Sequence, residues 1–269
     1  MIFETHAHYD DEKFDGDREQ LIENLLSGSI CSIVNVGASI ESTKTTIALA
    51  EKYDNVYAAA GVHPSETEEL NEEWFAWLKE QAKHPKTVAV GEIGLDYHWE
   101  KEEDQKTRQL YWFKRQMMLA KELSLPVIIH SRDAAEDTMQ TMKQLREQGI
   151  DVPCVIHCYS YSPEMAEEFV KMGYYIGVGG VVTFKNAKKL KETVARIPLD
   201  RILLETDAPY MAPEPFRGKR NDSGLLVYVA RKIAEIKGVA REEVEDVTRR
   251  NAERVFGVEK DEVGGYRYF

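Results

Sequence analysis

The sequence predicts a (β/α)8 TIM barrel, an α/β fold in which eight parallel strands form a ring inside a layer of helices. Short apolar runs alternate with longer amphipathic runs along the whole chain. Several of the short runs, such as residues 33–36 and 127–129, are apolar on both faces, which is typical of parallel strands covered by helices. The 269 residues also suit a barrel of this type. We therefore expect a single barrel domain over residues 1–269.

The short apolar runs define the expected strands, which are Ile2–His6, Cys31–Gly37, Val56–Val62, Thr87–Ile93, Pro126–His130, Cys154–Cys158, Tyr174–Val178 and Ile202–Thr206. The amphipathic runs define the expected helices, which are Arg18–Ser27, Ile40–Tyr53, Glu72–His84, Gln105–Leu123, Ala135–Gln148, Pro163–Met172, Ala187–Ile197, Gly224–Gly238 and Arg241–Phe256. An open doubly wound sheet is the alternative arrangement. No Gly-x-Gly-x-x-Gly follows the first strand, which counts against a dinucleotide-binding sheet.

The chain is acidic, with a formal net charge of −12. A protein that binds long duplexes through broad contacts with phosphates is usually basic, so this charge argues against such binding. Chemistry at a nucleic-acid end remains open, because bound metal ions would supply positive charge locally. The three cysteines, an odd number in largely apolar runs, are expected to be reduced thiols. The acidic start is not expected to be a signal peptide, and no apolar run approaches the roughly 18 residues of a membrane span. We expect a cytoplasmic protein.

Two histidines, His6 and His8, end the first expected strand. Side chains two residues apart on a strand point to the same side, so both imidazoles can reach one ion. Histidine is the commonest metal ligand. A His-x-His pair alone is also typical of a solvated turn, so the ends of the other strands decide between the two interpretations.

The carboxyl ends of barrel strands form the active site in this fold. The side chains expected there are His6, His8, His63, Glu92, His130, His157 and Asp207. A lone histidine at a strand end is more often structural than a ligand. Five histidines and two carboxylates at corresponding strand ends instead indicate a metal centre.

The candidate ligands outnumber the three protein groups that one catalytic zinc needs. The surplus suggests two ions bridged by a carboxylate and a water. Glu92 is the natural bridge, because in strand order it lies between the pair His6 and His8 and the pair His130 and His157. Asp207 could bind the first ion and take a proton from the water.

Six segments of the chain form a longer pattern: Glu4–His8, Gly61–Pro64, Gly91–Tyr97, Ile129–Arg132, His157–Tyr159 and Leu204–Tyr210. In order and spacing they resemble the TatD family of metal-dependent hydrolases. The resemblance runs from residue 4 to residue 220. It implies a (β/α)8 barrel with one or two divalent ions, Zn²⁺, Mn²⁺ or Mg²⁺, that hydrolyses phosphodiester bonds, typically as a DNase.

The resemblance also implies roles for the residues that match the family's motifs. The first ion would be held by His6, His8 and Asp207, the second by His130 and His157, with Glu92 between them. His63 would contact the scissile phosphate or the leaving group, and Arg132 would grip a phosphate oxygen, which suits its planar guanidinium. Glu205, two residues before Asp207, either orients a ligand or pairs with a basic residue.

Two loops depart from the family's usual pattern. Asp222 and Ser223 stand where members often have Glu-Pro, and residues 159–162 stand where many have Phe-Ser-Gly. The loops near the expected mouth carry two basic groups, Lys185, Lys188 and Lys189 and then Arg217, Lys219 and Arg220. They also carry aromatic residues that either stack on bases of a single-stranded end or pack in the rim: Tyr97, Trp99, Tyr159, Tyr161, Tyr210 and Phe216.

Three functions are compatible with these residues. The first is a metal-dependent hydrolase that cleaves DNA, at single-stranded regions or 3′ ends, through a metal-activated water. The alternative is an amidohydrolase-type esterase, lactonase or phosphatase; many such enzymes bridge their ions with a carboxylated lysine where this chain has Glu92. The third is a non-catalytic binding module, although a structural zinc usually has four closed ligands, often thiolates. The metal, exo- or endonuclease action, the oligomeric state (a monomer included) and the order of the tail 263–269 are left open.

Overall fold

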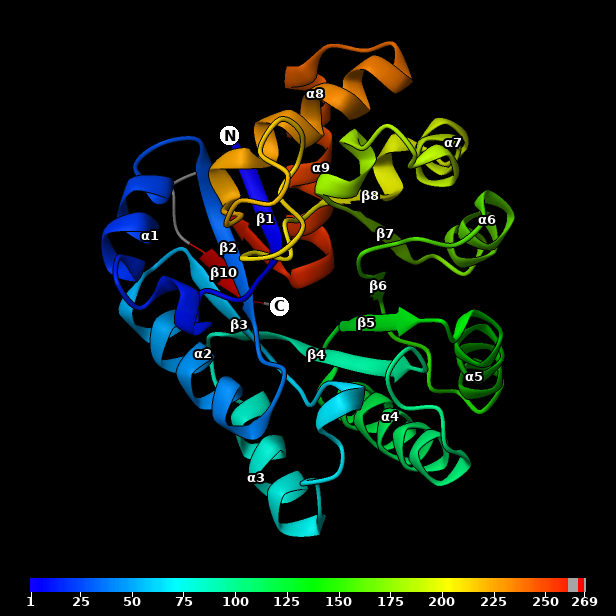
Figure 1. Ribbon diagram of the computed structural model, residues 1–269. Helices are drawn as coiled ribbons and strands as arrows, with labels where there is room; N and C mark the ends of the chain where they lie inside the picture. Colours follow the sequence, from blue (N-terminus) through cyan, green and yellow to red (C-terminus); the bar gives the residue numbers. More distant parts are fainter. Residues whose placement is uncertain (261–265, 269) are drawn as a thin grey trace.

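Eight parallel strands form the central barrel of the computed structural model, which describes residues 1–260 and 266–268. The strands follow one another around the barrel in chain order. They are β1 (Ile2–Ala7), β2 (Ile30–Val36), β3 (Val56–Ala60), β4 (Thr87–Asp96), β5 (Val127–Arg132), β6 (Cys154–Ile156), β7 (Tyr175–Val178) and β8 (Ile202–Leu204). Figure 1 shows the strands surrounded by the helices that connect them.

The first and last strands close the ring. Ala7 and Ala208 form a parallel bridge, and the amide of Asp207 donates to the carbonyl of His6 at 3.0 Å. The buried carboxylate of Glu4 accepts hydrogen bonds through one oxygen, Oε1, from the amides of His6 (3.1 Å) and Thr206 (3.0 Å). Closure leaves no free edge and sets the end of β1 directly beside the chain that follows β8.

The outer helices are α1 (Arg18–Leu26), α2 (Ile40–Lys52), α3 (Glu72–Ala82), α4 (Glu103–Leu123), α5 (Ala135–Glu147), α6 (Pro163–Lys171), α7 (Lys188–Arg196), α8 (Leu226–Lys237) and α9 (Arg241–Phe256). Several begin at a side chain that accepts a hydrogen bond from the first turn, as Ser39, Asn71 and Ser162 do. The last two end before Gly238 and Gly257, which adopt the left-handed conformation that glycine tolerates.

The barrel interior is apolar below the site and is covered by α9. Ile128, Val155 and Leu203 lie in one buried cluster with Val255 and Phe256 of α9. Ile128 and Val155 each precede a histidine of the site by two residues and so face the same side of their strands. The interior is therefore packed at its amino-terminal end, and only the carboxyl ends of the strands are left for polar groups.

Every expected strand and helix of the barrel is present, with ends that differ by a few residues. Strands β4 and β5 are longer than expected because they continue to pair, from Gly94 with His130 to Asp96 with Arg132. Strands β6 and β8 are shorter, and near their ends Cys158 (φ 45°) and Asp207 (φ 58°) have left-handed backbones that a strand does not allow.

Two short strands were not predicted. β9 (Val258–Lys260) pairs antiparallel with β10 (Tyr266–Tyr268), so this part of the expected tail has a defined backbone. The rest of the segment 263–269 lies outside the described residues. No helix in the described part of the chain is long and apolar enough to cross a membrane.

The close approach of β3 and β4 gives a test of the fold. A Cβ on Gly61 would lie 2.5 Å from the carbonyl carbon of Gly91, a contact with backbone that cannot move aside. We expect Gly61→Ala to lower the free energy of unfolding by about 1–3 kcal/mol, measured by urea denaturation. Gly16→Ala is the control, because a Cβ at Gly16 meets nothing within 4 Å. Equal stabilities of the two variants would contradict this packing.

Candidate metal centre

The imidazoles of His6 and His8 point into the mouth of the barrel from the end of β1. Their Nε2 atoms lie 3.2 Å apart. The Nδ1 of His8 donates to the carbonyl of Val36 at 2.8 Å, which leaves a lone pair on its Nε2. The ring of His6 is fully buried. The lone pairs of two neutral imidazoles would repel each other at this distance, so a proton or a metal ion must lie between these two nitrogens.

The two carboxylate oxygens of Glu92 face different histidine pairs. Oε2 lies 3.5 Å from Nε2 of His6 and 3.8 Å from Nε2 of His8. Oε1 lies 2.7 Å from Nδ1 of His130 and 3.8 Å from Nε2 of His157. Glu92 is buried between these pairs, so one carboxylate serves both halves of the cluster.

Asp207 completes the cluster from the β8 side. Its Oδ1 lies 3.5 Å from Nε2 of His8, 3.9 Å from that of His6 and 3.7 Å from that of His157. Most of these separations exceed a hydrogen bond and match those between ligands that each lie about 2.0–2.2 Å from a shared ion. The donor set of imidazoles and carboxylates therefore fits divalent metal ions.

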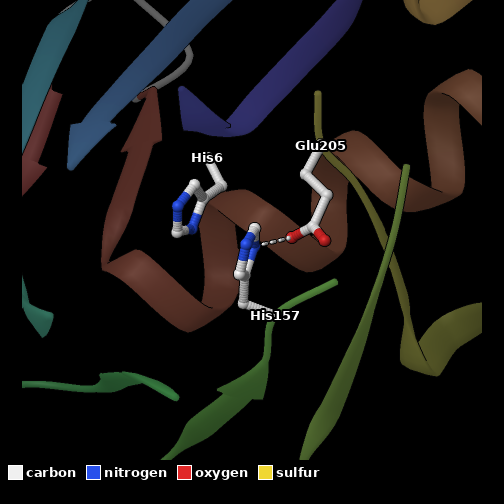
Figure 2. A group of neighbouring side chains, drawn as sticks. All are labelled: His6, His157 and Glu205. Carbon is white, nitrogen blue, oxygen red and sulfur yellow. Dashed lines mark ion pairs between the residues drawn. The ribbon is translucent and has the colours of Figure 1, made fainter. Parts of the chain in front are cut away.

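His157 is held from behind by Glu205, as Figure 2 shows. Nδ1 of His157 lies 3.1 Å from Oε2 of Glu205, and the His157 ring stacks on that of His6 with centroids 3.5 Å apart. The other oxygen of Glu205 accepts from the amide of Cys158 at 2.6 Å. Gly177 makes room, because a Cβ there would lie 2.2 Å from the Glu205 carboxylate. Among the described residues the charged partner of Glu205 is His157, and no lysine or arginine pairs with it.

Two acidic residues of the site were missed in the sequence. Oδ2 of Asp96 lies 3.0 Å from Nε2 of His130, so that imidazole has a carboxylate on each side. Asp96 was overlooked because the fourth strand was expected to end at Ile93. Glu4, the other, lies two residues before His6 on the same strand; that spacing was the available signal.

The remaining predicted residues, His63 and Arg132, lie at the second half of the site. The ring of His63 is 4.2 Å from that of His130, and atoms of His63, Glu92 and His130 are close enough to share an ion. Arg132 ends β5 and is exposed. Within the described part of the chain its guanidinium forms no ion pair, and it lies 5.7 Å from the centre of the Trp99 ring.

Burial and charge set the protonation of the cluster. Burial tends to raise the pKa of Glu92, but the charges of His157, His6 and His130 hold it well below its ordinary value. Burial tends to lower the pKa of His8, but the hydrogen bond and charge of Asp207 raise it to about 9. Burial and the charge of His130 lower the pKa of His63 to about 3. The ionised carboxylates therefore favour positive charge in the centre, whether carried by protons or by metal ions.

The basic groups at the rim differ in their freedom. Arg220 is engaged with Asp17 at 2.6 and 2.7 Å, so it is not free for an anion. Arg217 lies over the ring of Phe184, 4.4 Å from its centre. In the described chain, Lys185, Lys188, Lys189 and Lys219 are exposed and form no ion pair.

Comparisons with known proteins extend over nearly the whole chain. The TatD related DNase family profile matches residues 3–257. YabD of Bacillus subtilis, an uncharacterized metal-dependent hydrolase, is 46% identical over 259 residues, which are 96% of this chain and 100% of YabD. A protein of Cronobacter sakazakii named 3′-5′ ssDNA/RNA exonuclease TatD is 31% identical, over 95% of this chain and 97% of its own length. The crystal structure of YjjV, a TatD homolog from Escherichia coli, has a TM-score of 0.88 and 33% identity over 96% of this chain and 98% of YjjV.

Proposed function

Since the chain belongs to the TatD related DNase family, we propose that it is a metal-dependent hydrolase that cleaves nucleic-acid phosphodiester bonds. The observation that carries the proposal is that the two carboxylate oxygens of Glu92 face different histidine pairs. Oε2 faces His6 and His8, and Oε1 faces His130 and His157. A carboxylate shared in this way is what a pair of neighbouring ions requires.

One divalent ion would be held by His6, His8 and Asp207. The other would be held by His130 and His157, and Glu92 would contact both ions. Histidine-rich ligation favours Zn²⁺ or Mn²⁺ over Mg²⁺. When bound, such ions acidify a water and offset charge on the attacking and leaving oxygens. Asp96 and Glu205 would orient His130 and His157 by holding the nitrogen of each ring that does not face the metal.

The protein's own groups handle the proton and the phosphate. Asp207, part-exposed at the mouth, accepts a proton from the attacking water. Arg132 has no carboxylate partner among the described residues, so its guanidinium is free to bind a phosphate oxygen in two-point fashion. His63, with its pKa lowered to about 3 mainly by burial, is neutral at physiological pH and can contact the scissile phosphate or the leaving oxygen without adding charge.

The substrate is DNA presented as a single strand or a 3′ end. The net charge of −12 does not suit broad binding of duplex phosphates, so affinity must come from the site itself. The relative from Cronobacter sakazakii that is named an exonuclease for single-stranded DNA and RNA supports this class of substrate. The compartment we propose is the cytoplasm, where the three free cysteines would stay reduced.

Loss of either central carboxylate tests the chemistry. We expect Asp207→Asn and Glu92→Gln to lower kcat on a labelled single-stranded oligonucleotide by at least about 100-fold, because proton acceptance and shared ligation are removed. Glu214→Gln, which alters an exposed carboxylate on the loop after β8, is the control and should keep full activity.

Activity is measured with added Mn²⁺, Zn²⁺ or Mg²⁺ and after chelation. Full turnover by the two variants, or by chelated wild type, would overturn the proposal, and turnover of a nitrophenyl ester alone would favour the small-ester alternative.

Metal content tests the two halves separately. We expect His6→Ala and His8→Ala to bind one ion fewer than the wild type, because each removes a ligand of one half only. Glu92→Ala should weaken both. The measurement is elemental analysis of dialysed protein, with circular dichroism to show that the barrel is folded. If His6→Ala lost all metal, or none, the division of ligands between two ions would be wrong.

A further inference from the structure

We propose that Trp99 is the platform on which a base of the substrate strand stacks, next to the phosphate bound by Arg132. This inference rests on the proposed function and names the part of the site that selects an unpaired nucleotide. It is carried by the exposure of Trp99, by the anchoring of its loop and by its position beside Arg132.

Most aromatic residues near the mouth are already engaged. The hydroxyl of Tyr97 donates to Asp137 at 2.8 Å, that of Tyr161 bonds Ser131 at 2.9 Å, and that of buried Tyr159 donates to a backbone carbonyl. These hydroxyls therefore help to fix the rim. The Tyr159 ring is buried and the Tyr97 and Tyr161 rings are half-buried, so each leaves less surface free than Trp99 does.

The other two aromatic candidates have partners as well, although Tyr210 is 44% exposed. Phe216 packs edge-on against Tyr228, with centroids 5.2 Å apart. Tyr210 donates its hydroxyl to Asp11 at 2.7 Å, and the ammonium of Lys13 lies 4.2 Å from the centre of its ring. Of the five residues of the set whose rings carry a hydrogen-bonding group, Trp99 alone has no side-chain hydrogen bond in the described structure.

Trp99 is the most exposed large apolar side chain of the described residues, at 73%. A tryptophan left in water forfeits the stabilisation that burial of its large ring would give. Its ring interactions are with the His98 ring, nearly perpendicular to it with centroids 4.5 Å apart, and with the guanidinium of Arg132, 5.7 Å from its centre. The indole thus keeps a large surface free for a ligand.

The loop that presents Trp99 is anchored without the help of its indole. The amide of Tyr97 donates to the carbonyl of Arg132 at 2.9 Å, and His98 pairs with Asp133 at 2.9 Å. On the other side of Trp99, Glu100 accepts from Gln109 of α4 at 2.7 Å. The indole is therefore held out from a fixed loop, so a base meets a preorganised surface.

The loop also starts at the catalytic cluster. Asp96, which contacts His130, is followed directly by residues 97–102, and Arg132 is two residues after His130. A phosphate bound by Arg132 is joined to its own base through one sugar, which brings that base within reach of the adjacent indole. The positive guanidinium near the ring adds attraction for the phosphate on the same side.

This arrangement selects unpaired nucleotides. Inside a duplex both faces of each base are covered by its neighbours, so an indole stacks there only on a base that has left the helix, whereas the unpaired bases of a single strand offer free faces. Every base has such a face, so the platform predicts preference for single strands without strong sequence preference.

The test compares two oligonucleotides that differ only in the bases. One is a labelled oligothymidylate, and the other has the same phosphates with abasic tetrahydrofuran residues at the cleaved end. We expect Trp99→Ala to raise KM for the oligothymidylate about 5- to 150-fold with kcat within about twofold of wild type. KM for the abasic strand should be the same in both proteins, and Trp99→Phe should restore most of the affinity.

Two controls separate the platform from other effects. Trp74→Ala removes another exposed tryptophan, on α3, and should leave both KM values unchanged. In an inactive Asp207→Asn background, oligothymidylate should quench tryptophan fluorescence, and the quench should be lost with Trp99→Phe. The abasic strand should give little quench.

The outcomes distinguish this inference from the function beneath it. If wild type cleaves both strands and Trp99→Ala changes neither KM, the platform is wrong and the hydrolase stands. If Trp99→Ala raises KM equally for the abasic strand, the tryptophan acts on Arg132 or on the loop, and base stacking is again wrong. If wild type cleaves neither strand with any of the added metals, the proposed nucleic-acid hydrolysis is wrong, and the stacking platform is wrong with it.

Discussion

The junction between β1 and the chain after β8 is the constraint on which the site depends. Glu4 binds the amides of His6 and Thr206 through one oxygen, and the amide of Asp207 bonds the carbonyl of His6. These bonds close the barrel and, in the same place, set the β1 histidines beside the β8 carboxylate. A slip of one residue in this register would turn the ligands to the other face of the sheet. The same hydrogen bonds therefore close the fold and assemble the site.

The cluster is costly to bury without cations. Several carboxylates and imidazoles are packed at the mouth with few lysine or arginine partners, which a low-dielectric interior tolerates poorly. The depressed pKa of Glu92 keeps that carboxylate ionised, and the raised pKa of His8, about 9, compensates for its charge with a proton on the imidazole. A divalent ion would take the place of this proton, and its binding would release it. The apolar layer under the site, which α9 covers, confines the charged side chains to the carboxyl-terminal end of the barrel.

The sequence predicted the barrel well because its signal is local: apolar runs of strand length alternate with helical periodicity. It predicted that the candidate side chains would converge because barrel strands end on one face. It failed where a residue's role depends on a distant partner. Glu4 gains its role from Thr206, 202 positions later, and Asp96 remains in a strand only because Arg132 pairs with it on β5. The exposure of Trp99 was equally unreadable, since six aromatic residues near the mouth were equivalent until their contacts were known.

The proposed chemistry and the proposed substrate recognition thus lie on different parts of the molecule. The candidate ligands project from strands or from the first residues after them, and their positions follow from barrel geometry. Recognition falls to the loops, where the acidic centre poses a problem: Glu92, Asp96, Glu205 and Asp207 repel a phosphodiester until cations offset them. Arg132, free of carboxylate partners among the described residues, supplies positive charge at the edge of this centre. A neutral aromatic face such as Trp99 then adds affinity that does not depend on charge, which an acidic protein with an anionic substrate needs.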